Sequence, residues 1–518
     1  MNERKFKFHV PKPRRTAIHN ALRSFNASDK ELHAYYYDTP DHELGQKGIS
    51  LCVRCEAGQW LQTISLAGPN GQSGQAASHP RKDGTLSLAV YKGTEFADIL
   101  QPYRKTLHVR FEARITRLAA VQITEAAEIE IAYDRGTIIS GQFGIPIAET
   151  EFRLLSGDLD ELFTVCESWV NQHGLVLNLQ SKAALGHRLA RAASGIPIEL
   201  ADNPAKVDSK DARPPSPSMV GELLAPHRSE PLHLEAKQPI SEAYQAIALG
   251  CLTQVIQNLA YLALAHDTHA RPHATADYVH QARVGIRRLR SCWKLFEGWL
   301  GDSPPKQLEE VRQLFSRLGQ LRDSHIMADT IEPALLAAGM PPLEQSLNQK
   351  DNHAKAIELA QKTETQLLLL QLLRGVANAA DTDFGSDGSR SFDERFQQRV
   401  DRWLQKITEA GLSFKELSID EQHSVRKKAK RLRYGLEFGE DLLPAKRLKK
   451  VRRALARAQD VLGELNDLYV AEEHYRRLTD EQPSAWFAIG WLKSQQAQQL
   501  GRAQDAFIAL ADVGSLRN

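Results

Sequence analysis

The chain has 518 residues, of which 42% are hydrophobic and 25% charged, and its formal net charge is +2 at pH 7. This composition is ordinary for a soluble globular protein and excludes a disordered chain, a collagen and a disulfide scaffold. No stretch approaches the ~20 consecutive apolar residues of a membrane span, and the beginning of the chain lacks the apolar segment of a secretory signal. Because only five cysteines are present, we expect a cytoplasmic protein without a membrane partner.

The first third of the chain alternates charged and apolar residues with the period of a β-strand. Leu51 and Val53 alternate with Arg54 and Glu56, and the stretches at 109–114 and 149–153 repeat the pattern. Such alternation is typical of an antiparallel sheet with one face in solvent. It also fits a closed or cupped sheet whose charged face lines a lumen, where carboxylates would hold a divalent cation and cationic side chains would hold phosphate. The pattern alone leaves both interpretations open.

Seven prolines lie between Gly195 and Pro231, and no helical or strand period survives there. We therefore predict a proline-rich linker over residues 195–231. It separates a strand-rich domain at 1–194 from an all-helical domain at 232–510, in which Leu, Ala, Gln and Arg recur with helical spacing. The predicted fold class is a two-domain α+β chain.

The helical half contains an internal repeat. His280 and His423 each begin a segment with basic residues at +3, +7, +8 and +10, and the two segments are 143 residues apart. A second pair of similar segments begins at Leu318 and Leu462, which are 144 residues apart. Two motifs at nearly one offset indicate a duplicated helical unit, whose copies should pack with approximate two-fold symmetry.

Positions 0, +3, +7 and +10 of a helix form one stripe, so the basic residues of each copy should point the same way. Like charges at this spacing repel by a few tenths of a kcal/mol per exposed pair, so such a stripe needs a compensating partner. A polyanion is the obvious one, and a solvated basic face is the alternative that the duplication disfavours. The predicted binding residues are His280, Arg283, Arg287, Arg288, Arg290, Lys294 and Arg322 in the first copy and His423, Arg426, Lys427, Lys430, Arg431 and Arg433 in the second.

Motifs of the first half resemble those of a known domain. They are Tyr36–Asp41, Gly48–Leu51, Trp60–Thr63, Glu130–Gly136 and Ser181–Ala184, and in this order they resemble the CYTH domain, or triphosphate tunnel fold, over about residues 1 to 190. The resemblance implies an eight-stranded antiparallel tunnel or barrel that binds triphosphate or other organic phosphates with Mg²⁺ or Mn²⁺. It assigns phosphate binding to Lys7, Arg54, Arg114 and Lys182, and metal binding to Glu3, Glu130, Glu149 and Glu151.

Two positions depart from the CYTH pattern. Lys5 stands where the family has the second glutamate of its opening motif, and Ser65 stands where relatives carry a phosphate-binding lysine. An ammonium in place of a carboxylate changes the local charge by two units, so a divalent cation would be repelled there. We expect weakened metal binding and slow or absent triphosphate hydrolysis, and whether this half is an enzyme stays open.

Three segments of the second half, at 280–290, 430–438 and 459–467, resemble the CHAD domain over about residues 232 to 510. The resemblance implies two four-helix bundles related by a pseudo-two-fold axis, which bind long-chain inorganic polyphosphate in a basic channel without a cofactor. Association with polyphosphate-containing granules would follow. His280 and His423 either donate to phosphate when protonated or have a structural role, for instance by bonding Asp323 or Asp467.

Two other functions remain as alternatives to polyphosphate binding. The first is a metal-dependent inorganic triphosphatase that acts through the CYTH tunnel, with the helical half recruiting substrate; Lys5 and Ser65 argue against it. The second is a nucleic-acid binder, because any basic channel attracts phosphate. Few aromatic residues accompany the basic stripes, so base stacking is poorly supported and nucleic acid is not expected as a specific partner.

Overall fold

The structure is a computed structural model that describes residues 5–67, 73–194, 212–268, 272–299, 305–343, 349–379 and 391–516. Glu3 and the part of the predicted linker at 195–211 lie outside these residues. The chain forms two compact units. The first comprises Met1–His227, Ile256–Tyr278 and Ile357–Arg374, and the second comprises Arg228–Val255, Val279–Ala356 and Gly375–Asn518. The domain boundaries predicted from the sequence stay predictions.

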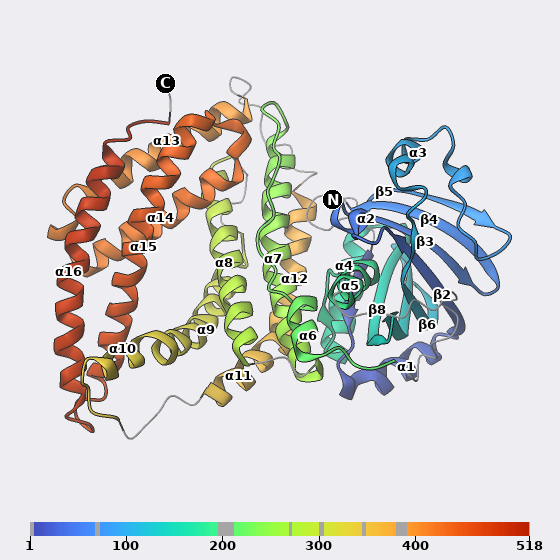
Figure 1. Cartoon of the computed structure of the whole chain (residues 1–518), viewed down its shortest axis with the longest axis horizontal. Helices are drawn as coiled ribbons and strands as arrows, with labels where there is room; N and C mark the ends of the chain where they lie inside the picture. Colours follow the sequence, from blue (N-terminus) through green and yellow to red (C-terminus); the bar gives the residue numbers. More distant parts are fainter. Residues whose placement is uncertain are drawn as a thin grey trace. The chain divides into compact units, whose positions relative to one another are not determined.

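The first unit is built on a nine-stranded antiparallel sheet (Figure 1). The strands pair in the order β5-β4-β3-β2-β6-β7-β8-β1-β9, so the first strand of the chain lies near one edge. No pairing among the described residues joins the edge strands β5 and β9. The strands are β1 (Lys5–His9), β2 (Ser28–Asp38), β3 (Ile49–Glu56), β4 (Gln59–Ala67), β5 (Ser73–Arg81), β6 (His108–Ile123), β7 (Ala127–Ser140), β8 (Phe143–Gly157) and β9 (Val176–Leu177).

The predicted antiparallel architecture of the first half is confirmed, with a short ninth strand in addition to the eight that the resemblance implied. The period-two alternation explains the two faces of the sheet, because successive side chains of a strand point to opposite sides. One face is apolar: Phe6 and Phe8 are fully buried, and Phe6 packs on Phe163 with ring centroids 4.8 Å apart. The other face carries charge and holds the tunnel residues described below.

Short helices surround this sheet. The α-helices of the strand-rich part are α1 (Arg15–Ser24), α2 (Glu43–Gln46), α3 (Glu95–Leu100), α4 (Leu159–His173), α5 (Lys182–Ala193) and α6 (Pro217–Leu223), and the 3₁₀ turns are η1 (Lys12–Arg14), η3 (Leu88–Tyr91) and η4 (Gln101–Tyr103). Helix α5 approaches β6 closely: a Cβ at Gly186 would come 2.0 Å from the Phe111 ring. Only glycine allows this approach, which places the first turn of α5 against the charged face.

Two segments of the helical half, at 256–278 and 357–374, belong to the first unit. The backbone N–H of Leu177 in β9 donates to Gln366 Oε1 at 2.9 Å, and Arg374 Nε donates to Asp160 Oδ1 at 2.6 Å. These contacts tie the sheet's covering elements to helices far along the chain. An intact chain is therefore the appropriate material for binding experiments.

The second half is helical, as predicted (Figure 1). The helices that build it are α7 (Ile240–Thr268), α8 (Pro272–Phe296), α9 (Leu308–Ile326), α10 (Glu332–Ala337), α11 (Gln349–Gln361), α12 (Thr363–Asn378), α13 (Phe392–Gly411), α14 (Ile419–Phe438), α15 (Ala445–Arg476) and α16 (Ala485–Ala511), with the π-helical turn η6 (Met327–Ile331) and the 3₁₀ turns η7 (Phe414–Glu416) and η8 (Glu440–Leu442). The two repeat copies correspond to α8 followed by α9 and to α14 followed by α15.

Local sequence signals fix the ends of α14, which carries the second basic stripe. Ser418 and Glu421 form a capping box at its start, with each side chain bonded to the other's backbone N–H. At its end, a Cβ at Gly439 would lie 2.3 Å from the Phe396 ring, so glycine lets α13 and α14 approach. The direction of the stripe is thereby set by its own flanking residues.

One described helix is long and apolar enough to cross a membrane by length and composition alone. It is α7, over Ile240–Leu264, and its apolar window is almost entirely buried inside the protein. A core helix passes the same test.

Candidate functional site

The basic stripes of the two repeat copies meet in one cluster. Burial is the largest cause of the lowered pKa values of His280, Lys430 and Arg426, and cations of the other copy lower them further: Lys430 acts on His280, and Arg287 acts on Lys430 and Arg426. Charges influence one another this strongly only when they are near neighbours in a poorly solvated place. We call the group the cationic cluster; its members are His280, Arg283, Arg287, Arg322, Arg426, Lys430 and Arg433.

The pKa shifts in the cationic cluster report half-buried, mutually repelling cations. Burial, followed by the charges of Arg433 and Arg287, lowers the pKa of Lys430 to about 7. Burial, followed by Arg322 and Arg287, lowers the pKa of His280 to about 4. The protonated lysine is therefore held in an unfavourable field that a bound anion would relieve.

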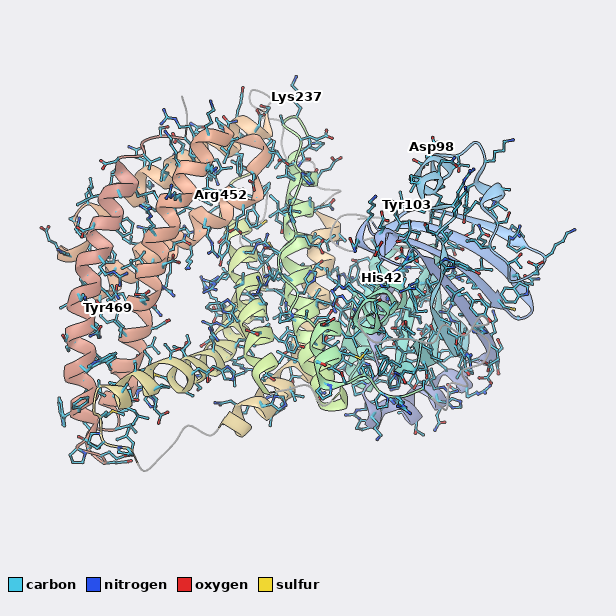
Figure 2. All side chains as sticks on the ribbon, in the orientation of Figure 1. His42, Asp98, Tyr103, Lys237, Arg452 and Tyr469 are labelled. Carbon is cyan, nitrogen blue, oxygen red and sulfur yellow. The ribbon has the colours of Figure 1, made fainter. Side chains whose placement is uncertain are left out.

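The histidines are uncharged at neutral pH in the ligand-free protein. Burial and then Arg426 lower the pKa of His423, as burial lowers that of His280. Neither histidine bonds to Asp323 or Asp467 within the described part of the chain. The rings of His423 and Tyr469 instead lie 5.7 Å apart at a steep angle, and the Tyr469 hydroxyl donates to Gln422 Oε1. Tyr469 is labelled in Figure 2.

The +3 arginine of each stripe also has a structural role. Arg283 Nη1 donates to the Phe315 carbonyl at 3.0 Å, and its guanidinium lies 4.3 Å from the centre of the Phe315 ring. In the second copy, Arg426 Nε donates to the Leu462 carbonyl at 3.2 Å. A Cβ at Gly319 would lie 2.4 Å from Arg283 Nη1, which explains the glycine of the first Leu-Gly-x-Leu motif. These bonds hold both arginines against the helix that follows.

Two aspartates lie among the arginines of the cationic cluster. Burial raises the pKa of Asp323 and Asp467, while Arg283 and Arg426 act in the opposite direction. The negative charge of Asp467 also raises the pKa of Asp323. With Asp460 beside Lys430 and Glu437 paired to Arg433, four carboxylates stand against six Lys and Arg side chains, so the cluster retains a surplus of positive charge.

The other predicted polymer-binding residues have different surroundings. Arg288 is only 3% exposed, donates to Gln254 Oε1 at 3.0 Å and lies 4.0 Å from Glu437. Its position 80–100° off the stripe turns it into the core, because 3.6 residues make a turn. Lys294 forms an ion pair with Glu297, and Lys427 is exposed. Arg290 lies over the ring of Phe315, and Arg431 lies over the ring of Trp403. Arg433 belongs to the cationic cluster and also pairs with Glu437 at 3.4 Å.

The charged face of the sheet forms a second candidate site. Residues that are direct cross-strand partners share a face of the sheet. One face therefore carries the charged partners of β1, β6, β7 and β8, which pair as Lys5–Arg153, Lys7–Glu151, Glu130–Arg153, Asp134–Glu149 and Arg117–Asp134. Arg54 lies on the same face through the registers Ala34–Arg54 and Ala34–Ala113. Lys182, in the first turn of α5, also contacts residues of this face.

Carboxylates and cations neutralise one another on this face. Lys182 Nζ lies 2.7 Å from Asp134 Oδ2 and also contacts Glu149. Arg117 donates to both oxygens of Asp134, at 2.7 and 2.8 Å. Burial would raise the pKa of Asp134, but Lys182 and Arg117 outweigh it and lower this pKa to about 2. The same lysine's pKa is raised because Glu149 and Asp134 outweigh its burial.

The predicted metal ligands do not fit a divalent cation. Glu130 is bonded by Arg153 at 2.8 Å, and Glu149 by Lys182. Burial would raise the pKa of Glu151, but Lys182 and Lys5 outweigh it and lower it. In the described residues, no three His, Cys, Asp or Glu side chains are grouped to hold a metal ion; Glu3 lies outside them. Hard cations need oxygen ligands that are not already paired with ammonium or guanidinium groups.

The structure does not bring Arg114 to the charged face. Its strand partners are His33 and Thr137, and its guanidinium bonds Glu112 at 2.8 Å on the opposite side of the sheet. Sequence reasoning assigned Arg114 from the family pattern and missed Arg117, three residues later. An odd offset in a strand reverses the face, and Asp134 of the Tyr133–Gly136 motif is the signal that identifies Arg117 as the inward residue.

Both halves match known domains. A family model of the CYTH domain matches residues 1–184, and a model of the CHAD domain matches 254–476. An inorganic triphosphatase of Haemophilus influenzae is 30% identical over 160 residues, which are 30% of this chain and 44% of that protein. The chain thus spans less than half the length of this curated relative.

Among solved structures, the CHAD domain from the plant Ricinus communis is similar, with 29% identity, 55% of this chain and 97% of that chain covered, and a TM-score of 0.46. A candidate adenylyl cyclase from Hippeastrum, described as revealing a dominant triphosphatase activity, is 11% identical over 35% of this chain and 93% of its own, with a TM-score of 0.27. The two family models match in sequence order, and the chain therefore belongs to the proteins that carry a CYTH domain followed by a CHAD domain.

Proposed function

We propose that this protein binds long-chain inorganic polyphosphate through the cationic cluster of its CHAD domain. The observation that carries the proposal is that Lys430 on α14 lies beside Arg287 on α8 and Arg433, where burial and then these two charges lower its pKa. A buried lysine held among arginines destabilises the folded protein unless a ligand compensates for it. Two stripes from duplicated helices provide such charges on both sides of one site.

Inorganic polyphosphate suits the chemistry of the cationic cluster. The polymer carries about one negative charge per phosphate and has no base edges, so charge and geometry must provide recognition. Guanidinium groups can bond two phosphate oxygens at once. Arg287 Nε is buried without a hydrogen-bond partner, so this arginine has donor capacity that a phosphate would use. Binding to polyphosphate-containing granules in the cytoplasm would follow from this activity.

The alternative is a metal-dependent inorganic triphosphatase that acts through the CYTH domain. The matching region of the Haemophilus influenzae inorganic triphosphatase favours it. The paired carboxylates of the charged face and the lysine at position 5 argue against it, because the carboxylates are already occupied by cations. We therefore place polyphosphate binding first.

The experiment is calorimetric titration of the full chain with long-chain polyphosphate at physiological salt, with triphosphate and RNA as controls. We expect tight binding of the polymer, weaker binding of triphosphate, and poor displacement of the polymer by RNA of equal charge. Efficient displacement by RNA would refute specific polyphosphate recognition. Absence of polymer binding, together with metal-dependent release of phosphate from triphosphate, would favour the alternative function.

A further inference from the structure

A separate pocket of about 270 Å³ lies between α8, α13 and α14. Helix α13 lines it with Arg399, Arg402, Trp403 and Lys406, and α14 contributes Arg431. Lys294 and Glu297, at the end of α8, complete the wall. Five of these seven residues are cationic and one is acidic, so the pocket has a formal charge of +4. Lys294 and Arg431 are among the predicted polymer-binding residues but lie outside the cationic cluster, and none of the α13 residues belongs to the basic stripes.

Two of the five cations are used by the fold itself. Lys294 Nζ lies 2.5 Å from Glu297 Oε1, so these charges cancel. Arg399 Nη1 donates to the carbonyls of Leu295 and Glu297 at 3.1 and 2.7 Å, and its guanidinium lies 4.4 Å from the centre of the Trp299 ring. Arg399 thereby satisfies carbonyls at the C-terminal end of α8, which otherwise lack partners.

Three cations and one indole N–H remain without a hydrogen-bond partner in the described structure. Arg402 and Lys406 are exposed, one turn apart on α13. The Arg431 guanidinium lies 5.8 Å from the centre of the Trp403 ring, and burial lowers the pKa of Arg431. Trp403 is half-buried and lines the pocket. The three cations line one pocket, and the carboxylate in its wall, Glu297, is already paired with Lys294.

We propose that this pocket is a second anion site that binds an oligophosphate group of about two or three phosphates, the number that three unpaired cations can neutralise. The proposal goes beyond polymer binding by the cationic cluster and does not rest on it. The chemistry has two possible sources, the end of an inorganic polyphosphate chain and the triphosphate of a nucleotide. Trp403 offers a stacking surface that only a nucleotide base would use.

The test uses the full chain and sodium tripolyphosphate as the probe, with ATP as a second probe. The variant is Arg402→Glu/Lys406→Glu, and the matched control is Lys449→Glu/Lys450→Glu, which reverses two exposed lysines on α15. We expect the first variant to bind tripolyphosphate at least tenfold more weakly than wild type and the control to bind it normally. Equal affinity in variant and control, or no binding by the wild type, would overturn the proposal.

Further arms separate the sources and the two sites. Tighter binding of ATP than of tripolyphosphate, abolished by Trp403→Ala, identifies a nucleotide; equal binding identifies an inorganic chain end. The variant Arg287→Glu/Lys430→Glu removes charge from the cationic cluster and should leave tripolyphosphate binding at the pocket unchanged. Loss of tripolyphosphate binding in this variant would show that the probe binds the cluster instead, and would contradict the proposal even if polymer binding is real.

Discussion

Charged side chains are buried in both halves of the molecule, but the two halves balance them differently. On the charged face of the sheet, carboxylates and cations form ion pairs. Asp134 pairs with Arg117 and Lys182, and Lys182 also pairs with Glu149. In the cationic cluster, arginines and Lys430 face one another, and the carboxylates near them, Asp323, Asp467, Asp460 and Glu437, are fewer than the cations. The pKa values of the central lysines differ: that of Lys182 is raised and that of Lys430 is lowered, although burial also lowers the pKa of Lys7 on the charged face.

The difference in charge balance indicates that the cationic cluster, and not the charged face of the sheet, would be stabilised by an anionic ligand. A buried ion pair with good geometry is complete within the fold, and breaking it is costly. A group of buried like charges costs folding free energy, and proteins retain such groups where function requires them. Comparison of the two lysines therefore separates a structural charge from a ligand-binding charge.

The largest expected effect on ligand binding is the loss of affinity for the polymer. Replacing Arg287, Arg290, Lys430 and Arg433 by Glu should weaken polyphosphate binding by at least about 100-fold, or about 2.7 kcal/mol, because favourable contacts become repulsive. Retention on a polyphosphate column measures the loss, and circular dichroism checks that helical content is intact. The matched control reverses exposed lysines outside the cluster, Lys428, Lys449 and Lys450, together with Lys446. Unchanged retention of the cluster variant would exclude the cluster as the site.

The two lysines should respond oppositely to replacement by methionine. Lys182→Met leaves Asp134 and Glu149 without their cation and should lower the free energy of unfolding by about 3 kcal/mol. Lys430→Met removes a repelled charge and should raise it by about 1 kcal/mol, while weakening polymer binding. Chemical denaturation at pH 7 measures both, and Lys450→Met serves as an exposed control. Changes of the same sign would contradict the comparison.

Polymer binding should depend on pH through Lys430. Its pKa in the free protein is about 7, and a bound polyanion favours the protonated form, so binding takes up a proton as the pH rises through 7. Affinity should fall between pH 6.5 and 8.5, by at most about tenfold per pH unit for one linked proton. Titrations in buffers with different ionisation enthalpies detect the uptake. Lys430→Arg, which stays charged, should flatten the profile, and an equally steep profile in this variant would exclude Lys430 as the linked group.

The smallest effect concerns the charged face of the sheet. Lys5→Glu replaces an ammonium by a carboxylate beside the Arg153–Glu130 pair and Glu151, and should strengthen Mn²⁺ binding by a few fold through the change of two charge units. Calorimetry with Mn²⁺ on the full chain measures this, with Lys12→Glu as an exposed control outside the face. No gain over the control would show that Lys5 does not limit metal binding.

The sequence predicted the fold class and the meeting of the two stripes, because strand alternation, helical spacing and duplication are local patterns. It could not separate Arg288 from Arg287, since their different surroundings depend on how α7 and α14 pack around α8. It placed Arg114 with the tunnel residues, whereas strand register places Arg117 there. The lowered pKa values of His280 and Lys430 arise from contacts between copies, which spacing within one copy does not reveal.

The most direct test of the account is an experimental structure of the full chain bound to polyphosphate of intermediate length. We expect phosphate oxygens within hydrogen-bond distance of Arg287 and Lys430, with the polymer running between the stripes of α8 and α14. Polyphosphate bound only at the charged face of the sheet, beside Lys182, would contradict the assignment of the polymer site to the cationic cluster.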